Sequence, residues 1–317
     1  LTLHRVRPNR DDSFDPNAHL SVEEGFLASI VHMLQRRGIE FISMDDVAER
    51  VKAGRSGSRF CSVTFDDGYC DTARSAAPIL FRNGVPFTVY VASGLVEGTA
   101  DLWWELVEEI VRRNDSIAIP VKNGATLLEC ETSAEKDVAI RSIIDFLTKE
   151  LDENEQREWV RNLCSLYRID ADTLQSGQIM DWSAINRLAE NPLCTIGSHT
   201  VSHRALGRIS AKDVEREIRT GVDTIEAATG KRPKHFAYPY GYRAAASQRE
   251  FDIARECGVT TAVTTRPGML FSEHADHMTA LPRISVNGLY QTARHFAPLT
   301  SGLPTRLKTR FRRLDVA

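Results

Sequence analysis

Two adjacent aspartates follow an apolar, strand-like segment, in the sequence TFDDGY at residues 64–69. Two carboxylates in one pocket can divide their work, one holding a metal ion and the other moving protons. Neighbouring residues of an extended chain point in opposite directions, so Asp66 and Asp67 can share a pocket only if the chain bends, which Gly68 would permit. An Asp-Gly pair is also common in surface turns, so this segment alone leaves both a catalytic site and a simple turn open.

Two histidines four residues apart follow a second short apolar segment, in the sequence IGSHTVSH at residues 196–203. In a helical turn, this spacing would place His199 and His203 on the same side. Two imidazoles and one carboxylate form a familiar zinc site that keeps an open position for water. A lone histidine is usually structural, but this pair, combined with the aspartate pair after another strand, predicts a metal site.

A third motif, FAYPYG at residues 236–241, also closes a strand-like segment. Pro239 and Gly241 favour a turn, and the side chains of Tyr238 and Tyr240 could form a wall of the size of a sugar ring. A backbone N–H in such a turn can stabilise a developing oxyanion. A stiff loop without a catalytic role is the alternative interpretation of this segment.

Strand-like and helix-like segments alternate along most of the chain, which predicts parallel strands joined by crossover helices. Seven or eight such units favour a closed α/β barrel, and the carboxyl ends of barrel strands form the catalytic face. The predicted strands and helices include the following segments: strands at Ile39–Ile42, Phe60–Phe65, Phe87–Val91, Cys194–Ile196, His235–Tyr238, Val259–Val263 and Leu281–Val286; helices at Val22–Arg37, Thr72–Arg82, Asp181–Glu190, Ser210–Thr229 and Gln248–Cys257.

Residues 98–180 interrupt this alternation, because the segment shows mostly helical patterns and little strand signal. We interpret the chain as one barrel domain, 1–317, with a helical insertion at 98–180. Trp103 and Trp104 in the insertion could line a glycan cleft, although packing among the inserted helices is the favoured interpretation. The basic tail Thr305–Arg313 is predicted to be a terminal helix packed on the barrel, with contact to a membrane surface as the rarer alternative.

Composition excludes several classes of protein. The formal net charge of −3 over 317 residues does not fit a generally basic nucleic-acid-binding protein. No apolar run reaches the roughly 18 residues of a membrane span, and the six cysteines form no C-x-x-C pair. These features favour the cytoplasm. Because the sequence begins at Leu1, a removed signal and a periplasmic or exported protein stay open.

The three motifs, in this order, resemble the polysaccharide deacetylase family, the NodB-homology domain of carbohydrate esterase family 4. The segments LHRV at 3–6 and LPRI at 281–284 are similar to family variants with an N-terminal histidine strand. The similarity covers essentially the whole chain except the insertion. It implies a distorted (β/α) barrel with about seven strands, and a metal-dependent hydrolase that removes N-acetyl groups from an amino-sugar carbohydrate, either a polysaccharide or its precursor. In the cytoplasm, the substrate would be a lipid-linked or nucleotide-linked sugar precursor.

The resemblance also implies a role for individual residues. Asp67, His199 and His203 would hold the metal, Zn²⁺ in the first place, with Co²⁺ or Ni²⁺ as other divalent candidates. Asp66 would be the general base. The backbone N–H of Tyr240 would be the oxyanion donor, and His4 would be the general acid.

Substrate contacts and one departure from the family complete the prediction. Tyr69, Tyr238 and Pro239 are predicted to contact the acetylated substrate. Many members have an arginine before the aromatic turn, where it orients the base; this chain has Ala237 there, and Arg283 could take over that duty. Three alternatives stay open: the same site acting on a non-sugar amide or cyclic imide, the same site acting on an O-acetyl ester, and a catalytically silent carbohydrate-binding barrel.

Overall fold

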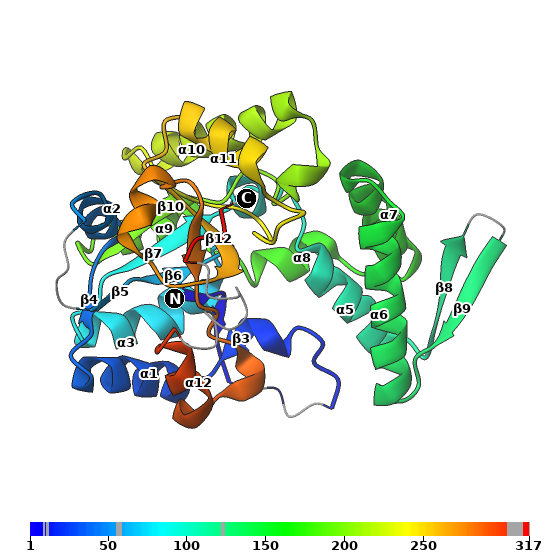
Figure 1. Ribbon diagram of the computed structural model, residues 1–317. Helices are drawn as coiled ribbons and strands as arrows, with labels where there is room; N and C mark the ends of the chain where they lie inside the picture. The colour runs from blue at the N-terminus through cyan, green and yellow to red at the C-terminus, as the bar shows by residue number, and fades with distance from the viewer. Residues whose placement is uncertain (9, 11–12, 55–58, 122–123, 303–312, 317) are drawn as a thin grey trace.

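A seven-stranded parallel sheet forms the centre of the molecule in the computed structural model, which describes all residues except 9, 11–12, 55–58, 122–123, 303–312 and 317 (Figure 1). Most residues of the strands are buried, as in parallel sheets that helices cover on both faces. In sheet order they are β1 (Thr2–Leu3), β6 (Val63–Phe65), β7 (Phe87–Val91), β10 (Cys194–Ser198), β11 (His235–Ala237), β12 (Thr261–Pro267) and β13 (Leu281–Arg283).

The sheet closes on itself where the chain that follows β13 meets β1. Thr2 donates its N–H to the carbonyl of Ile284 at 2.9 Å and accepts the N–H of Val286 at 2.9 Å. A parallel bridge between Thr2 and Ser285 joins the same two segments. The predicted distorted barrel of about seven strands is therefore confirmed.

Helices surround the barrel and bury their apolar sides against it. The long helix α10 (Ala211–Thr229) begins and ends where the sequence predicts: Ser210 accepts the N–H of Asp213, and Gly230 follows the helix with a φ of 71°. The other helices are α1 (Glu24–Arg36), α2 (Met44–Lys52), α3 (Ala77–Arg82), which continues a π-helical turn at Thr72–Ala76, α4 (Ser93–Val96), α9 (Trp182–Ala189), α11 (Gln248–Glu256) and α12 (Ala293–Leu299).

Two short parallel strand pairs, four 3₁₀ turns and one π-helical turn complete the elements outside the insertion. The strand pairs are β2 (Arg5–Val6) with β3 (Ser21–Val22), and β4 (Glu40–Phe41) with β5 (Phe60–Cys61). The 3₁₀ turns are η1 (Ala18–Leu20), η3 (Leu206–Arg208), η4 (Ser272–Asp276) and η5 (Gly288–Tyr290), with the π-helical turn before α3 labelled η2.

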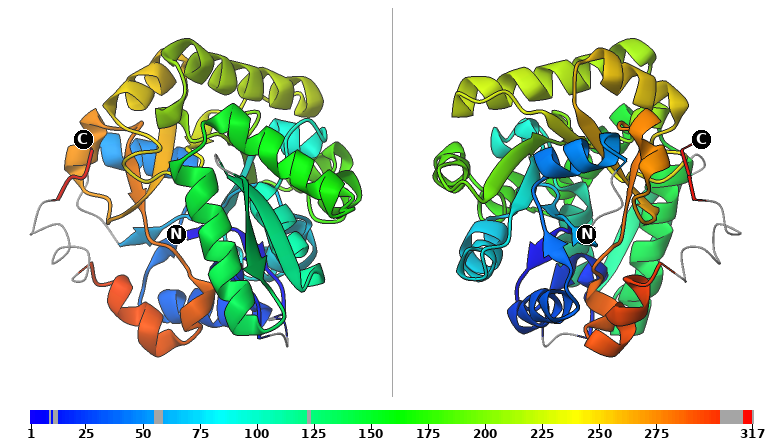
Figure 2. Two further views of the ribbon diagram at one scale, coloured as in Figure 1. Left: turned by 90° about the vertical axis from the view of Figure 1, so that its right-hand side faces the viewer. Right: turned by 60° about the vertical axis from the view of Figure 1, so that its left-hand side comes forward.

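Residues 98–180 fold to one side of the barrel as a group of helices with a projecting hairpin (Figures 1 and 2). The helices are α5 (Trp103–Arg113), α6 (Ser133–Lys149), α7 (Glu153–Leu166) and α8 (Ala171–Ser176). The antiparallel hairpin of β8 (Ser116–Val121) and β9 (Gly124–Glu129) was not predicted, because β9 is largely exposed and lacks an apolar alternation. The insertion has its own apolar cluster, which also includes Tyr69 of the first motif.

Most of the tail predicted as a helix at 305–313 lies outside the described residues, so that prediction and its membrane-surface alternative are not tested by the structure. Within the part of the chain that is described, none of the helices combines the length and the hydrophobicity needed to cross a bilayer.

Candidate active site

The predicted motifs meet at the carboxyl end of the barrel, each directly after a strand. Among the described residues, five other than glycine have a positive φ, and four of these lie in the motifs: Asp67, Thr200, His203 and Tyr240. Such backbone conformations are costly and concentrate at functional sites. The bend that the sequence assigns to Gly68 in fact begins at Asp67, with φ values of 73° at Asp67 and 86° at Gly68.

Asp67, His199 and His203 form a buried group that could hold a metal ion. The Oδ1 atom of Asp67 lies 3.1 Å from Nε2 of His203 and 3.4 Å from Nε2 of His199. One ligand atom from each of the three residues lies within 4.8 Å of the others. Among the described residues, this is the group of His, Cys, Asp or Glu side chains that is close enough to hold a metal ion. The three side chains predicted from the sequence as metal ligands are thus brought together.

Hydrogen bonds at this group fit a divalent cation. Nδ1 of His199 donates to the carbonyl of Ala237 at 2.7 Å, which leaves the lone pair on Nε2, the atom that faces Asp67. Oδ1 of Asp67 is buried and accepts no hydrogen bond from the described residues. A buried anionic oxygen without a donor, beside two imidazole nitrogens, matches the nitrogen and oxygen ligands that Zn²⁺ takes in three-ligand sites.

The charges of the three side chains depend on one another. Burial raises the pKa of Asp67, but the adjacent imidazoles of His199 and His203 outweigh burial and hold that pKa well below its usual range. For His199, burial lowers the pKa, yet Asp67 and Asp66 outweigh burial and the pKa is raised. For His203, burial prevails and the pKa is lowered. Asp67 is therefore an anion at neutral pH and available as a ligand.

Asp66 is held by Arg283, the last residue of β13. The guanidinium donates to both carboxylate oxygens of Asp66, at 2.7 and 2.6 Å, and also to the hydroxyl of Thr64 and the carbonyl of Thr264. Burial raises the pKa of the Asp66 carboxyl, and the Arg283 charge more than offsets it, so the pKa is lowered. The contact suggested for Arg283 in place of an arginine at Ala237 is present.

His4 and Tyr240 flank this pair and the metal group. Nε2 of His4 lies 3.9 Å from Oδ2 of Asp66, and about a quarter of the His4 side chain is exposed. The ring of Tyr240 lies 5.0 Å from the ring of His203, and its hydroxyl accepts a hydrogen bond from Nε1 of Trp103 at 2.8 Å. Both residues predicted for proton donation and oxyanion binding therefore lie at this face, while their chemical roles stay predictions.

The three residues predicted to contact substrate are all buried. Tyr238 has no exposed surface, packs against Phe236 and Phe251, and donates its hydroxyl to the carbonyl of Thr279 at 2.9 Å. Tyr69 is equally buried, and Pro239 is also buried. The rings of Tyr69 and Tyr238 therefore pack in the interior, and the contacts of these residues with substrate stay predictions.

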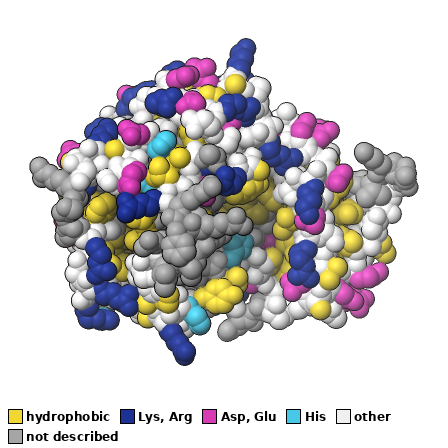
Figure 3. Space-filling model, viewed as in Figure 1, with side chains coloured by type: hydrophobic (Ala, Val, Ile, Leu, Met, Phe, Trp, Pro, Cys, Tyr) yellow, Lys and Arg dark blue, Asp and Glu magenta, His cyan; other side chains and the backbone are white. Residues whose placement is uncertain are grey.

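One exposed aromatic ring that the sequence analysis missed lies beside Tyr240. Tyr242 is 49% exposed, and its ring lies 6.3 Å from that of the partly buried Tyr240. Its place just beyond the FAYPYG motif was the available signal. Figure 3 shows a hollow with hydrophobic side chains and a histidine between the barrel and the insertion.

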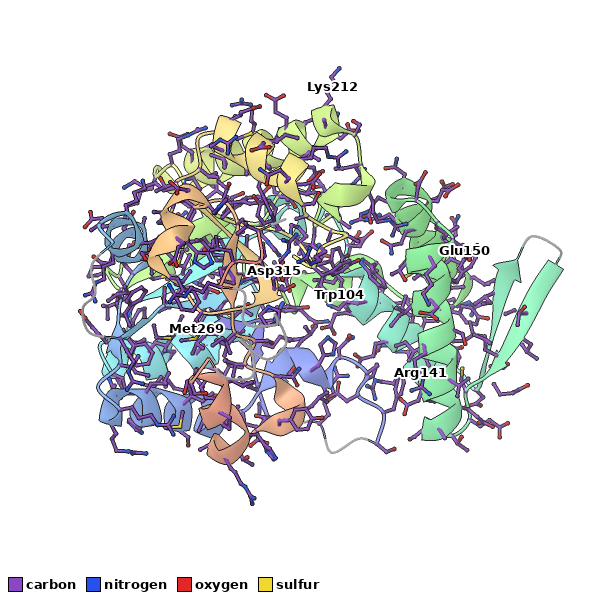
Figure 4. The ribbon with its side chains drawn as sticks, viewed as in Figure 1. Trp104, Arg141, Glu150, Lys212, Met269 and Asp315 are labelled. Carbon is purple, nitrogen blue, oxygen red and sulfur yellow. The ribbon has the colours of Figure 1, made fainter. Side chains whose placement is uncertain are left out.

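The insertion contributes to the site, in contrast to the favoured interpretation that its tryptophans pack only among inserted helices. The Trp104 ring lies 4.9 Å from the ring of His203, and its Nε1 donates to the Tyr69 hydroxyl at 3.0 Å. In Figure 4, Trp104 lies where the insertion meets the barrel. Trp103 and Trp104 are nearly buried, so they pack as predicted, but against the site as well as against the insertion.

The segment between the two histidines is a loop and not the helical turn that the spacing suggested, because Thr200 and His203 both have positive φ. Glu217 of α10 holds this loop by accepting hydrogen bonds from the N–H groups of Val201 and Ser202 and from the Ser202 hydroxyl, at 2.5 to 3.0 Å. Sequence reasoning did not find Glu217, which lies inside an ordinary amphipathic helix.

The model of the polysaccharide deacetylase family matches residues 53–119 and 146–262, more than half of the chain. The chain belongs to the polysaccharide deacetylase family. The resemblance stated from the motifs is confirmed, and the family match omits residues 120–145, within the insertion. No curated protein sequence matches this family member.

Solved structures show the same fold in other deacetylases. The Streptococcus pyogenes deacetylase PplD, in complex with acetate, has 16% identity and a TM-score of 0.60, with 91% of each chain covered. IcaB from Ammonifex degensii has 16% identity and a TM-score of 0.59, covering 95% of this chain and 94% of that chain. A de-N-acetylase from Aggregatibacter actinomycetemcomitans has 13% identity and a TM-score of 0.58, covering 94% and 98%.

Proposed function

We propose that the protein is a metal-dependent hydrolase that removes N-acetyl groups from an amino-sugar carbohydrate. One observation carries the proposal: a buried Asp67, His199 and His203 group lies beside a second carboxylate, Asp66, that is fixed by Arg283 on the same face of a polysaccharide deacetylase barrel. A silent carbohydrate-binding barrel would not need this complete set of ligands and a separately held base.

The side chains divide the hydrolysis of the amide among them. A divalent cation, when held by Asp67, His199 and His203, would polarise the acetyl carbonyl and lower the pKa of water. Asp66 takes a proton from the attacking water. The N–H of Tyr240 donates to the carbonyl oxygen as it becomes negative. His4 gives a proton to the departing nitrogen when the carbon–nitrogen bond breaks, so the products are acetate and a free amine.

The pair of Asp66 and Arg283 suits a base that must stay ionised and correctly aimed. Its lowered pKa keeps Asp66 anionic at neutral pH, and the two-pronged contact fixes the carboxylate plane. His4 is the more exposed of the two proton-carrying side chains. This placement supports a donor that reaches the departing group from the solvent side.

The class of substrate rests on the family and on the rim of the site. Tyr240 and the exposed Tyr242 offer aromatic surface of the kind on which sugar rings stack. The burial of Tyr69, Tyr238 and Pro239 leaves little ring surface for a sugar at these positions and favours, as a second candidate, a non-sugar amide or an O-acetyl ester at the same site. A cytoplasmic enzyme acting on a lipid-linked or nucleotide-linked precursor remains our proposal for compartment and substrate form.

The test combines metal content with acetate release from N-acetylated chito-oligosaccharides, for wild type, His199→Ala and Asp66→Asn. We expect about one zinc per wild-type chain, lost together with acetate release in His199→Ala. Asp66→Asn should keep the metal and lose most of its turnover. Turnover that survives in Asp66→Asn would contradict the role of the base.

Two other outcomes separate the alternatives. Metal without acetate release from sugars would direct the search to acetylated small amides and O-acetyl esters, assayed with the same samples. A wild-type chain that takes up neither zinc nor cobalt would contradict a metal-dependent hydrolase and favour the silent barrel.

A further inference from the structure

His203 lacks the hydrogen bond that usually orients a metal-binding histidine. Such a residue ordinarily donates its second ring N–H to a carbonyl or carboxylate, as His199 does to Ala237. Nδ1 of His203 is buried and has no hydrogen-bond partner among the described residues. Other contacts must therefore fix this residue. The rings of Trp104 and Tyr240, with centroids 4.9 and 5.0 Å from that of His203, hold its imidazole ring. They do not explain what holds its backbone.

The backbone of His203 is held from the insertion by Arg157, which lies on α7. One nitrogen of its guanidinium, NH2, donates to the carbonyl of Ser202 at 2.9 Å and to the carbonyl of His203 at 3.0 Å. The other, NH1, donates to the carboxylate of Glu153 at 2.9 Å. Glu153 is buried and lies one turn before Arg157 on the same helix, so this ion pair fixes the Arg157 guanidinium. The Glu153 carboxylate also lies 3.6 Å from the guanidinium of Arg208.

Glu217 of α10 holds the same peptide segment from the barrel. The carboxylate of Glu217 accepts the N–H groups of Val201 and Ser202, while Arg157 donates to the carbonyls of Ser202 and His203. The Glu217 carboxylate on α10 thus binds N–H groups of this loop, and the Arg157 guanidinium on α7 binds its carbonyl groups. His203 keeps a φ of 51° there, a conformation that persists only where surrounding contacts enforce it.

We propose that Arg157 is a positioning residue of the metal site and that α7, although part of the insertion, is a working part of it. Arg157 does not touch the ligand atoms; it fixes the backbone from which the His203 ring projects. The inference rests on the metal site of the proposed function. It extends that site to a residue outside every catalytic motif of the sequence.

The experiment compares Arg157→Ala with Arg161→Ala on the same helix. Arg161 makes a bidentate ion pair with Asp101, at 2.7 and 2.8 Å, so its removal also deletes an arginine ion pair from α7 but leaves the histidine loop untouched. Metal-free proteins are titrated with Co²⁺ and with Zn²⁺. We expect Arg157→Ala to bind about 10- to 100-fold more weakly than wild type and Arg161→Ala to bind within about twofold of it.

A second measurement on the same metal-free samples follows hydrogen exchange of peptides that cover residues 198–205. The N–H groups of Val201, Ser202 and His203 are hydrogen-bonded in this loop. They should exchange faster in Arg157→Ala and at the wild-type rate in Arg161→Ala. This measurement needs no metal, so it tests the role of Arg157 separately from the proposed metal site. A wild-type protein that binds no metal would contradict the metal site, and the exchange rates would still show whether Arg157 holds the loop.

Each remaining outcome also decides the proposal. Unchanged affinity and unchanged exchange in Arg157→Ala would overturn it, as would equal losses in the Arg161→Ala control. Should Arg157→Ala fail to fold, Arg157→Lys takes its place, because lysine keeps the charge next to Glu153 but lacks the planar fork that spans several acceptors. Weaker metal binding in that variant supports the proposal, and wild-type binding together with wild-type exchange refutes it.

Discussion

Arg283 and Asp66, 217 positions apart, form a bidentate ion pair inside the barrel, with guanidinium-to-carboxylate distances of 2.7 and 2.6 Å. The pair joins the end of β13 to the end of β6, on either side of β1, where the barrel closes. Arg283 accounts for the lowered pKa of the carboxyl, since burial alone would raise it. The same contact that fixes the base therefore also keeps it ionised.

Arg283→Lys should slow the reaction by about 10²-fold or more, because an ammonium group cannot form the fork that aims the carboxylate. The pKa of Asp66 should rise toward the value that burial imposes. A base must be ionised to act, so the acid limb of the kcat/KM profile should move to higher pH. The measurement is a pH–rate profile for wild type and variant. Arg266→Lys, a buried arginine that bonds the carbonyl of Ala246 away from Asp66, is the control, and an acid limb shared by all three proteins would contradict the assignment.

Gly221 of α10 gives the histidine loop room to approach the helix. A Cβ atom at this position would lie 2.9 Å from the backbone carbon and oxygen of Thr200. Gly221→Ala should therefore lower the free energy of unfolding by about 1–3 kcal/mol and weaken metal binding, even though alanine favours helix. The control is Gly25→Ala in α1, where nothing lies within 4 Å of the added atom; it should stabilise by about 0.4–1 kcal/mol. Chemical denaturation measures both, and equal effects at the two sites would count against the close approach.

The sequence predicts those features that depend on local pattern. The strand Phe87–Val91 and the helix before Gly230 have the predicted bounds within one residue, since alternation and capping act over a few positions. The meeting of Asp67 with the two histidines could also be predicted, because the carboxyl ends of parallel barrel strands share one face.

Features that depend on how distant segments fold together could not be read from the sequence. The contact of Trp104 with His203 exists only because the insertion folds back onto the barrel face. The spacing of the two histidines suggested a helical turn. Thr200 and His203 instead adopt the left-handed backbone conformation, which the sequence does not indicate because neither residue is a glycine. Tyr238 lies next to the end of β11, where the sequence does not show which side of the sheet a side chain takes.

Tyr238→Phe tests whether this buried tyrosine belongs to the core or to the substrate site. The hydroxyl donates to the buried carbonyl of Thr279, so its removal should cost about 1–3 kcal/mol of unfolding free energy while kcat and KM stay within about twofold of wild type. Tyr242→Ala should behave in the opposite way. Its exposed ring can be removed within about 0.5 kcal/mol of wild-type stability, and KM for an oligosaccharide should rise. A raised KM in Tyr238→Phe would restore this residue to the substrate site.

Glu108 of α5 gives the insertion a pH-dependent stability. It is buried, and burial together with the nearby Glu105 raises its pKa to about 7, although Arg10 and Asn17 oppose the rise. Between its ordinary pKa and about pH 7, the folded chain therefore holds a proton that the unfolded chain has released, so this contribution to stability is complete at low pH and is lost as the pH rises.

Glu108→Gln should remove that loss. We expect the variant to lose less stability than wild type between about pH 4.5 and 7, by at most about 3 kcal/mol over the interval. Urea denaturation across this range measures the difference in unfolding free energy, in which groups common to both proteins cancel. A difference that stays constant with pH would show that Glu108 is already ionised in the folded protein, paired with Arg10 and Arg112.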